Sequence, residues 1–260
     1  MSATGFTGIV VILLFLGLMI FFYFIREDRE EDSLREIPGY KKISEQINQA
    51  VEDGTQLHIS LGRAGINGPE SAAALAGLSI LQQVIQKSSV CDYPPLATTG
   101  EATISILAQD TIKGTSKAIK VGEHDRLSYG ELVGLTPFSY AAGTLTTIRD
   151  ENVSANVFTG WFGSETIWLT TAGERQSSPT IAGTGQLPAQ AVMYASASQP
   201  LIGEELYAGG AYLGAGKLHR AGVTTQDVFR WIIIALILGG VLLNILGLDQ
   251  FLESILAGSL

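Results

Sequence analysis

Two long apolar segments, one near each end, stand apart from the rest of the hydrophobic pattern. Residues 5–25 contain no charged side chain, and the second segment, residues 229–248, is free of charge from Trp231 onward. A helix of about 20 apolar residues crosses the hydrocarbon core of a bilayer. The sequence therefore predicts a transmembrane helix over each segment, and a lipid bilayer as a partner of the protein.

The basic residues around these segments are distributed asymmetrically, which predicts an orientation. The outer flanks, residues 1–4 and 249–260, carry no Lys or Arg, whereas the inner flanks carry several, and basic flanks face the cytoplasm. We therefore expect a two-pass protein with both termini outside and residues 40–220 in the cytoplasm. Residues 26–39 form a charged juxtamembrane segment, and the C-terminal tail is amphipathic. The inner-flank basic residues are Arg26, Arg29, Arg35, Lys41, Lys42, Lys217, Arg220 and Arg230.

Between the two apolar segments, short runs with strand-like alternation are interleaved with runs of helical period. This order predicts an α/β domain, with a mixed or mostly parallel sheet flanked by helices, inserted between the two transmembrane helices. The expected strands are 55–61, 96–99, 155–161, 179–182 and 191–197, with a hairpin over 117–121 and 127–129. The expected helices are 40–53, 69–87, 101–112, 137–149, 164–172 and 201–213.

Composition narrows the class of function. The net charge of −9 disfavours nucleic acid as a partner, since phosphate binding needs clustered Lys and Arg. The single cysteine, Cys91, excludes an intramolecular disulfide framework and a cysteine-based zinc site. The three histidines have no metal-ligand spacing, and no catalytic triad pattern occurs. We therefore expect no cofactor and no metal, and we assign no catalytic residue. These observations favour a non-enzymatic protein over an enzyme.

A glycine-rich loop is the first candidate binding element. Gly62, Arg63, Gly65 and Gly68 lie between an expected strand and an expected helix. Backbone N–H groups exposed in such a loop can hold an anion or phosphate, and Arg63 would add positive charge. The spacing is neither that of a dinucleotide fingerprint nor that of a P-loop. The alternative is a tight packing turn without a ligand.

A recurring Gly-Glu or Gly-x-Glu step is the second candidate. It places Glu70, Glu101, Glu165 and Glu204 at strand-to-helix junctions. A glutamate in a first helical turn complements the helix dipole, which explains the pattern without a ligand. In open α/β sheets, however, these junctions meet at the carboxyl edge, where ligands bind. Several carboxylates there would disfavour an anion and suit a cation, an amine or a polyol.

Three short motifs carry a resemblance to a known family. Pro38-Gly39-Tyr40, the run from Leu61 to Ile66 and the run from Ala97 to Gly100 are similar to a family of bacterial membrane proteins with a domain of unknown function. The resemblance covers most of the chain and implies a bacterial inner (plasma) membrane. It implies no activity.

Three functions follow as hypotheses. The first is a scaffold or assembly subunit, forming a homo-oligomer or a larger membrane complex. The second is a membrane-tethered domain that binds or senses a small molecule, through the glycine-rich loop or the glutamate junctions. The third is a carboxylate-dependent hydrolase. An α/β fold alone does not choose among them.

Overall fold

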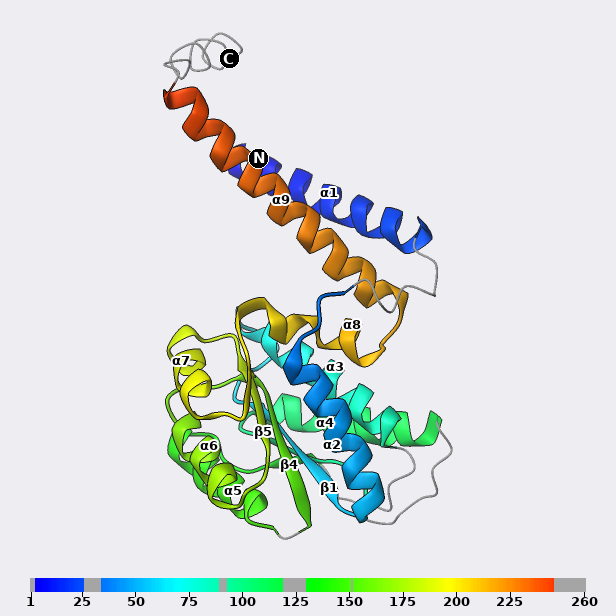
Figure 1. The fold of residues 1–260 in the computed structure, drawn as a ribbon, viewed down its shortest axis with the longest axis vertical. Coiled ribbons are helices and arrows are strands. Elements are labelled where there is room, and N and C mark those ends of the chain that lie inside the picture. Colours follow the sequence, from blue (N-terminus) through cyan, green and yellow to red (C-terminus); the bar gives the residue numbers. More distant parts are fainter. Residues whose placement is uncertain (1–2, 26–33, 89–92, 119–129, 151, 246–260) are drawn as a thin grey trace. The chain divides into compact units, whose positions relative to one another are not determined.

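The computed structural model describes residues 3–25, 34–88, 93–118, 130–150 and 152–245 (Figure 1). Contacts divide the chain into two units. One unit contains the two long helices, α1 (Ala3–Ile25) and α9 (Lys217–Ile245). The other, Glu31–Gly216, is an α/β unit. Residues 26–33 of the charged segment 26–39, the last three residues of the second apolar segment and the tail 249–260 lie outside the described residues.

Six parallel strands form one sheet in the α/β unit, in the order β3-β2-β1-β4-β5-β6. The predicted α/β class with a mostly parallel sheet is thereby confirmed, while the membrane-spanning character of the flanking helices stays a prediction. The strands are β1 (Gln56–Gly62), β2 (Leu96–Thr99), β3 (Gly130–Leu132), β4 (Val153–Trp161), β5 (Thr180–Thr184) and β6 (Gln199–Leu201).

Helices cover both faces of this sheet (Figure 1). On one face, α2 (Pro38–Asp53), α3 (Ser71–Lys87) and α4 (Ala102–Ala118) pack Ile43, Leu81 and Ile104 onto the sheet. On the other, α5 (Pro137–Ile148), α6 (Thr166–Arg175) and α7 (Leu187–Ser196) pack Tyr140, Leu169 and Met193. Strands covered on both faces are buried almost continuously, as β1 and β4 are.

The two ends of the α/β unit are bonded to each other. After β6 the chain forms a 3₁₀ turn, η2 (Gly203–Ala208), and the short helix α8 (Gly209–Leu213). Arg35 pairs with Glu205 at 2.5 Å, and the Tyr212 hydroxyl donates to the Arg35 carbonyl at 2.6 Å. The Tyr40 hydroxyl donates to the Glu205 carbonyl, and its ring stacks on Tyr212 at 5.2 Å. We call Arg35, Tyr40, Glu205 and Tyr212 the terminal clasp.

The helical unit consists of α1 packed against α9. The partly buried residues of α1, Phe15, Leu18, Met19 and Phe22, share one face, and the Phe15 and Phe229 rings lie 5.5 Å apart. The remaining residues of the apolar part of α9 are mostly exposed. Both helices are long and apolar enough to span a membrane, judged by length and composition alone.

Two expected elements differ in the structure. Residues 191–197, expected as a strand, belong almost entirely to α7, because Pro188 fits the first turn of a helix that begins at Leu187. Residues 201–213, expected as one helix, instead contain the end of β6, η2 and α8. Gly203 has a positive φ of 61° and breaks a continuous α-helix there.

The expected hairpin over 117–129 is wrong at its first two residues. Lys117 and Ala118 complete α4, which continues past its expected end at residue 112. Residues 119–129 lie outside the described part of the chain. The expected helix over 137–149 is confirmed as α5, and a reciprocal capping box between Thr136 and Ser139 explains its start.

Candidate functional site

The strand order reverses between β1 and β4. These two strands are neighbours, but the chain leaves β1 toward α3 on one face and β4 toward α6 on the opposite face. In open parallel sheets of this order, ligands bind outside the carboxyl ends of the strands at the reversal. We call the carboxyl ends of β1 and β4, with the loops that follow them, the switch point. It contains Arg63 and Glu165 from the sequence analysis.

The loop after β1 starts in a conformation that requires glycine. Gly62 has φ +74°, and a Cβ placed on it would collide with the carbonyl oxygen of Trp161 in β4. The next amide, of Arg63, donates to that same carbonyl at 2.9 Å. The Gly62 carbonyl in turn accepts from the amide of Gly100 at the end of β2. The start of the loop is therefore fixed between its two neighbouring strands.

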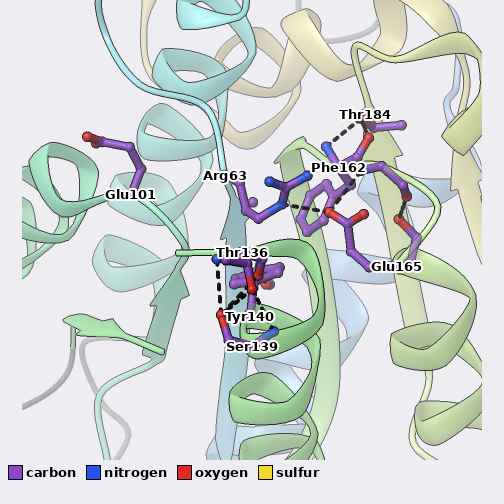
Figure 2. A network of polar contacts seen from close by, with 12 residues as sticks. Arg63, Glu101, Thr136, Ser139, Tyr140, Phe162, Glu165 and Thr184 are labelled. Atoms are coloured by element: carbon purple, nitrogen blue, oxygen red, sulfur yellow. Dashed lines mark hydrogen bonds and ion pairs between the residues drawn. The ribbon is translucent and has the colours of Figure 1, made fainter. Parts of the chain in front are cut away.

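An ion pair joins the two loops of the switch point. Arg63 Nε donates to Glu165 Oε1 at 2.8 Å, and the Gly163 amide donates to the same oxygen at 3.1 Å (Figure 2). The Glu165 side chain is 2% exposed and that of Arg63 is 23% exposed. Burial alone would raise the pKa of Glu165, but Arg63 and the backbone amides outweigh burial and lower it. Glu165 is therefore ionised near neutral pH.

Part of the Arg63 guanidinium is left for another partner. Within the described part of the chain, its two η nitrogens make no hydrogen bond, and the side chain reaches solvent. A guanidinium offers five N–H donors in a planar fork that matches carboxylate and phosphate oxygens. Because Glu165 holds the Nε edge, the direction of the remaining donors is set before any ligand arrives.

The other glutamates have separate local roles. Glu101 caps α4, since its Oε2 accepts from the Ile104 amide at 2.9 Å and its Oε1 from the Thr103 hydroxyl at 3.1 Å. Its carboxylate points away from Arg63 (Figure 2). A Cβ built on Gly65 would lie 3.6 Å from the Glu101 side chain, so the glycine-rich loop passes beside this stem.

Glu70 and Glu204 complete the expected set. The Glu70 carboxylate folds back over Gly68, where a Cβ would collide with it. Glu204 lies in the first turn of η2, beyond β6 and three strands from β1 in the sheet order. The structure thus joins Arg63 to Glu165 and places Gly65 beside Glu101. Among the described residues, no group of three or more His, Cys, Asp or Glu side chains could hold a metal ion.

A buried chain of hydrogen bonds lies under the switch point, and the sequence analysis did not identify it. The Tyr140 hydroxyl bonds to that of Ser60, which lies 3.1 Å from Thr98 Oγ1. Thr98 bonds to His58 Nε2 at 2.8 Å. His58 Nδ1 lies 2.8 Å from Asn156 Oδ1, and Asn156 Nδ2 donates to Ser178 Oγ at 2.9 Å. We call Tyr140, Ser60, Thr98, His58, Asn156 and Ser178 the buried polar chain.

The bonds at one end of the buried polar chain fix the position of the proton on His58. Ser178 donates its proton to the Ser154 carbonyl, so it accepts from the Asn156 amide, whose oxygen then faces His58. His58 must carry its proton on Nδ1, and burial lowers its pKa to about 4, against a weaker opposite effect of Asn156. The Thr98 hydroxyl lies 2.8 Å from the bare Nε2 of neutral His58, and it donates to Ser60 Oγ at 3.1 Å.

The sequence of β1 contains a signal for the buried polar chain, but the same pattern is also typical of a solvent-exposed strand face. His58 and Ser60 alternate with Leu57, Ile59 and Leu61, which is typical of a strand with one solvent-facing side. In the structure both polar residues are fully buried. Buried polar groups need partners, and the partners come from β2, α5 and β4, far away in sequence.

Comparison with known proteins places the chain in a family. No curated protein and no solved structure gives a match. One family model, described as "Domain of unknown function (DUF6754)", matches residues 2–255. The match agrees with the expected domain of unknown function, while a bacterial source and a membrane family stay predictions. Since the match covers nearly the whole sequence, the chain belongs to the DUF6754 family.

Proposed function

We propose that this protein is a membrane-anchored binding protein whose α/β unit holds a small ligand with a carboxylate or phosphate group at the switch point. One observation carries the proposal. The Arg63 guanidinium is fixed through Nε by the buried Glu165, while its η nitrogens have no partner in the described part of the chain. Of the three hypotheses from the sequence, this geometry favours the second.

The stabilising value of the ion pair does not explain its presence. Removing two charges from water costs several kcal/mol per ion, and apolar side chains of similar volume often serve stability as well. A guanidinium held in place has a clear use in binding, because its remaining donors lose little freedom when an oxyanion arrives. The position at the reversal of strand order, where ligands of this fold class bind, supports the same reading.

We propose an oxyanion as the ligand in place of the cation, amine or polyol that the recurring glutamates suggested. The Arg63–Glu165 pair has no net charge, and the Glu101 carboxylate is engaged in capping α4. What the switch point offers a ligand is then the set of directed N–H donors on the η nitrogens of Arg63. A lowered pKa of Glu165 also gives no support to a hydrolase that would use it as a proton donor.

We further propose that α1 and α9 anchor the α/β unit in a bacterial inner membrane, with both termini outside and the unit in the cytoplasm. The length and composition of the two helices and the distribution of basic residues support this. The terminal clasp supports it too, since a helical hairpin needs the ends of the inserted unit close together. Self-assembly stays a prediction, to be tested by the mass of the complex extracted gently from its membrane.

Ligand-induced stabilisation tests the binding proposal. The full chain in detergent is melted with inorganic phosphate, nucleoside monophosphates and a panel of di- and tricarboxylates. A ligand at 100 times its Kd stabilises the folded state by about 2.7 kcal/mol, a readily measured shift in Tm. We expect at least one compound to stabilise the wild type and an Arg149→Gln control, whose exposed arginine ends α5, but not Arg63→Gln. Equal shifts in the Arg63→Gln and Arg149→Gln variants, or no shift with any compound, would contradict the proposal.

A further inference from the structure

Large apolar side chains are exposed along the carboxyl edge of the sheet. Leu135 lies between β3 and α5 and is 67% exposed, and Phe138 in the first turn of α5 is 70% exposed. Trp168 in the first turn of α6 is 45% exposed, and Leu187, the first residue of α7, is 76% exposed. We call these four residues the apolar rim. Each precedes or begins a helix that follows a strand, so all four lie at one edge.

Two residues of the apolar rim are in contact, and none of its four side chains is charged. The Phe138 and Trp168 rings lie 5.3 Å apart, and α6 packs against both α5 and α7. The first turns of the three helices contain no acidic residue. Single exposed apolar side chains are ordinary, but a contiguous apolar patch marks an interaction site. The four rim side chains are themselves uncharged, although the whole chain has a net charge of −9.

Both ends of the α/β unit leave it from this same edge. The start of α2 lies beside the end of β6, since a Cβ on Gly39 would lie against Leu201, and η2 follows β6 directly. The terminal clasp then holds the two ends together. Three residues separate α8 from α9 and span at most about 11 Å. Both connections from the α/β unit to the apolar helices therefore start at its carboxyl edge.

We propose that the apolar rim docks on the surface of the bilayer that holds α1 and α9. Phe138, Trp168 and Leu187 enter the headgroup region, where a tryptophan ring with a polar N–H is favoured. Docking orients the carboxyl edge, and the switch point with it, toward the membrane. The inference rests on the proposed membrane anchoring but not on a ligand at Arg63, so it can fail or hold separately from the proposed ligand binding.

Quenching of Trp168 by lipids tests the docking. The full chain is reconstituted in vesicles whose lipids carry bromine near the headgroup end of the acyl chains. Trp161→Phe and Trp231→Phe leave Trp168 as the emitter. The matched control replaces all three tryptophans by Phe and adds Tyr194→Trp, two turns further along α7 and 72% exposed in the native chain. We expect bromine to quench Trp168 at least twofold more than the tryptophan at position 194.

A second variant keeps the test decisive. Phe138→Ser with Leu187→Ser changes exposed side chains only, so the circular dichroism of the full chain should be unchanged while the quenching of Trp168 falls. Equal quenching at positions 168 and 194 would refute the docking. Docking would also be refuted by a dependence on protein concentration. In that case the bromine quenching disappears as the protein is diluted in lipid, while Trp168 in concentrated vesicles stays shielded from aqueous iodide. A second copy of the chain, and not the bilayer, would then cover the rim.

Discussion

Protonation of His58 should destabilise the α/β unit as the pH falls below 6.5. The side chain is fully buried, and burial lowers its pKa to about 4 in the folded state, against an ordinary value of 6.5. Above pH 6.5 both the folded and the unfolded states are neutral at this residue. Below it, the unfolded state binds a proton that the folded state rejects, so stability is lost as the pH falls.

The size of the effect follows from the two pKa values. A difference of about 2.5 pK units corresponds to about 3.4 kcal/mol once the pH is well below 4 and the transition is complete. At pH 5 about 2 kcal/mol of this is lost. Burial gives the physical reason, because the charged ring would lie away from water between two uncharged partners, Asn156 and Thr98.

Urea unfolding of a fragment spanning residues 34–216 measures this loss. Free energies of unfolding are compared at pH 7.5 and pH 5 for the wild type and for His58→Gln, which cannot titrate. The variant is less stable at pH 7.5, because it leaves buried partners unsatisfied. We expect the wild type to lose about 2 kcal/mol more than the variant between the two pH values. Other titrating groups are common to both proteins and cancel, so equal losses would refute the reasoning.

Further predictions concern the elements that build the site. Gly54 and Gly62 both have positive φ, but only Gly62 would meet a neighbouring carbonyl, so Gly54→Ala should cost about 1 kcal/mol in a thermal melt and Gly62→Ala several times more. Thr136→Ala removes the cap of α5 and should cost about 1 kcal/mol of unfolding free energy. The same substitution at an exposed threonine that caps no helix should leave the unfolding free energy unchanged. Tyr140→Phe removes the hydroxyl that shares a hydrogen bond with Ser60 and should cost about 1–3 kcal/mol, and an unchanged stability would exclude that hydrogen bond.

The strands that the sequence revealed are those with strong alternation or continuous apolar burial. β1, β2, β4 and β5 lie close to their expected positions, since each carries several β-branched or apolar residues between turn signals. β3 and β6 have three residues each and contain Gly130 and Pro200, so their sequences carry almost no strand signal. α7 was misread because Ala191 to Ala197 is a short, apolar run in which helix and strand look alike.

Local signals located parts of the candidate site but not its partnerships. The glycine-rich loop singled out Arg63, and the Gly-x-Glu step singled out Glu165. Their pairing depends on β1 and β4 being adjacent, although 102 positions separate the two residues. The buried polar chain was out of reach for the same reason, because His58, Thr98 and Asn156 come from three strands whose order no local pattern encodes.

The terminal clasp has a mechanical consequence. A force that pulled the two ends of the α/β unit apart would load the Arg35–Glu205 pair and the Tyr212 hydrogen bond first. These bonds would yield before the three-residue strand β6 is stripped from the edge of the sheet. The Arg35 side chain is 76% exposed, so its pair with Glu205 is weak and easily remade. The clasp would therefore act as a reversible latch that yields to a pull on either end of the unit while the sheet stays intact.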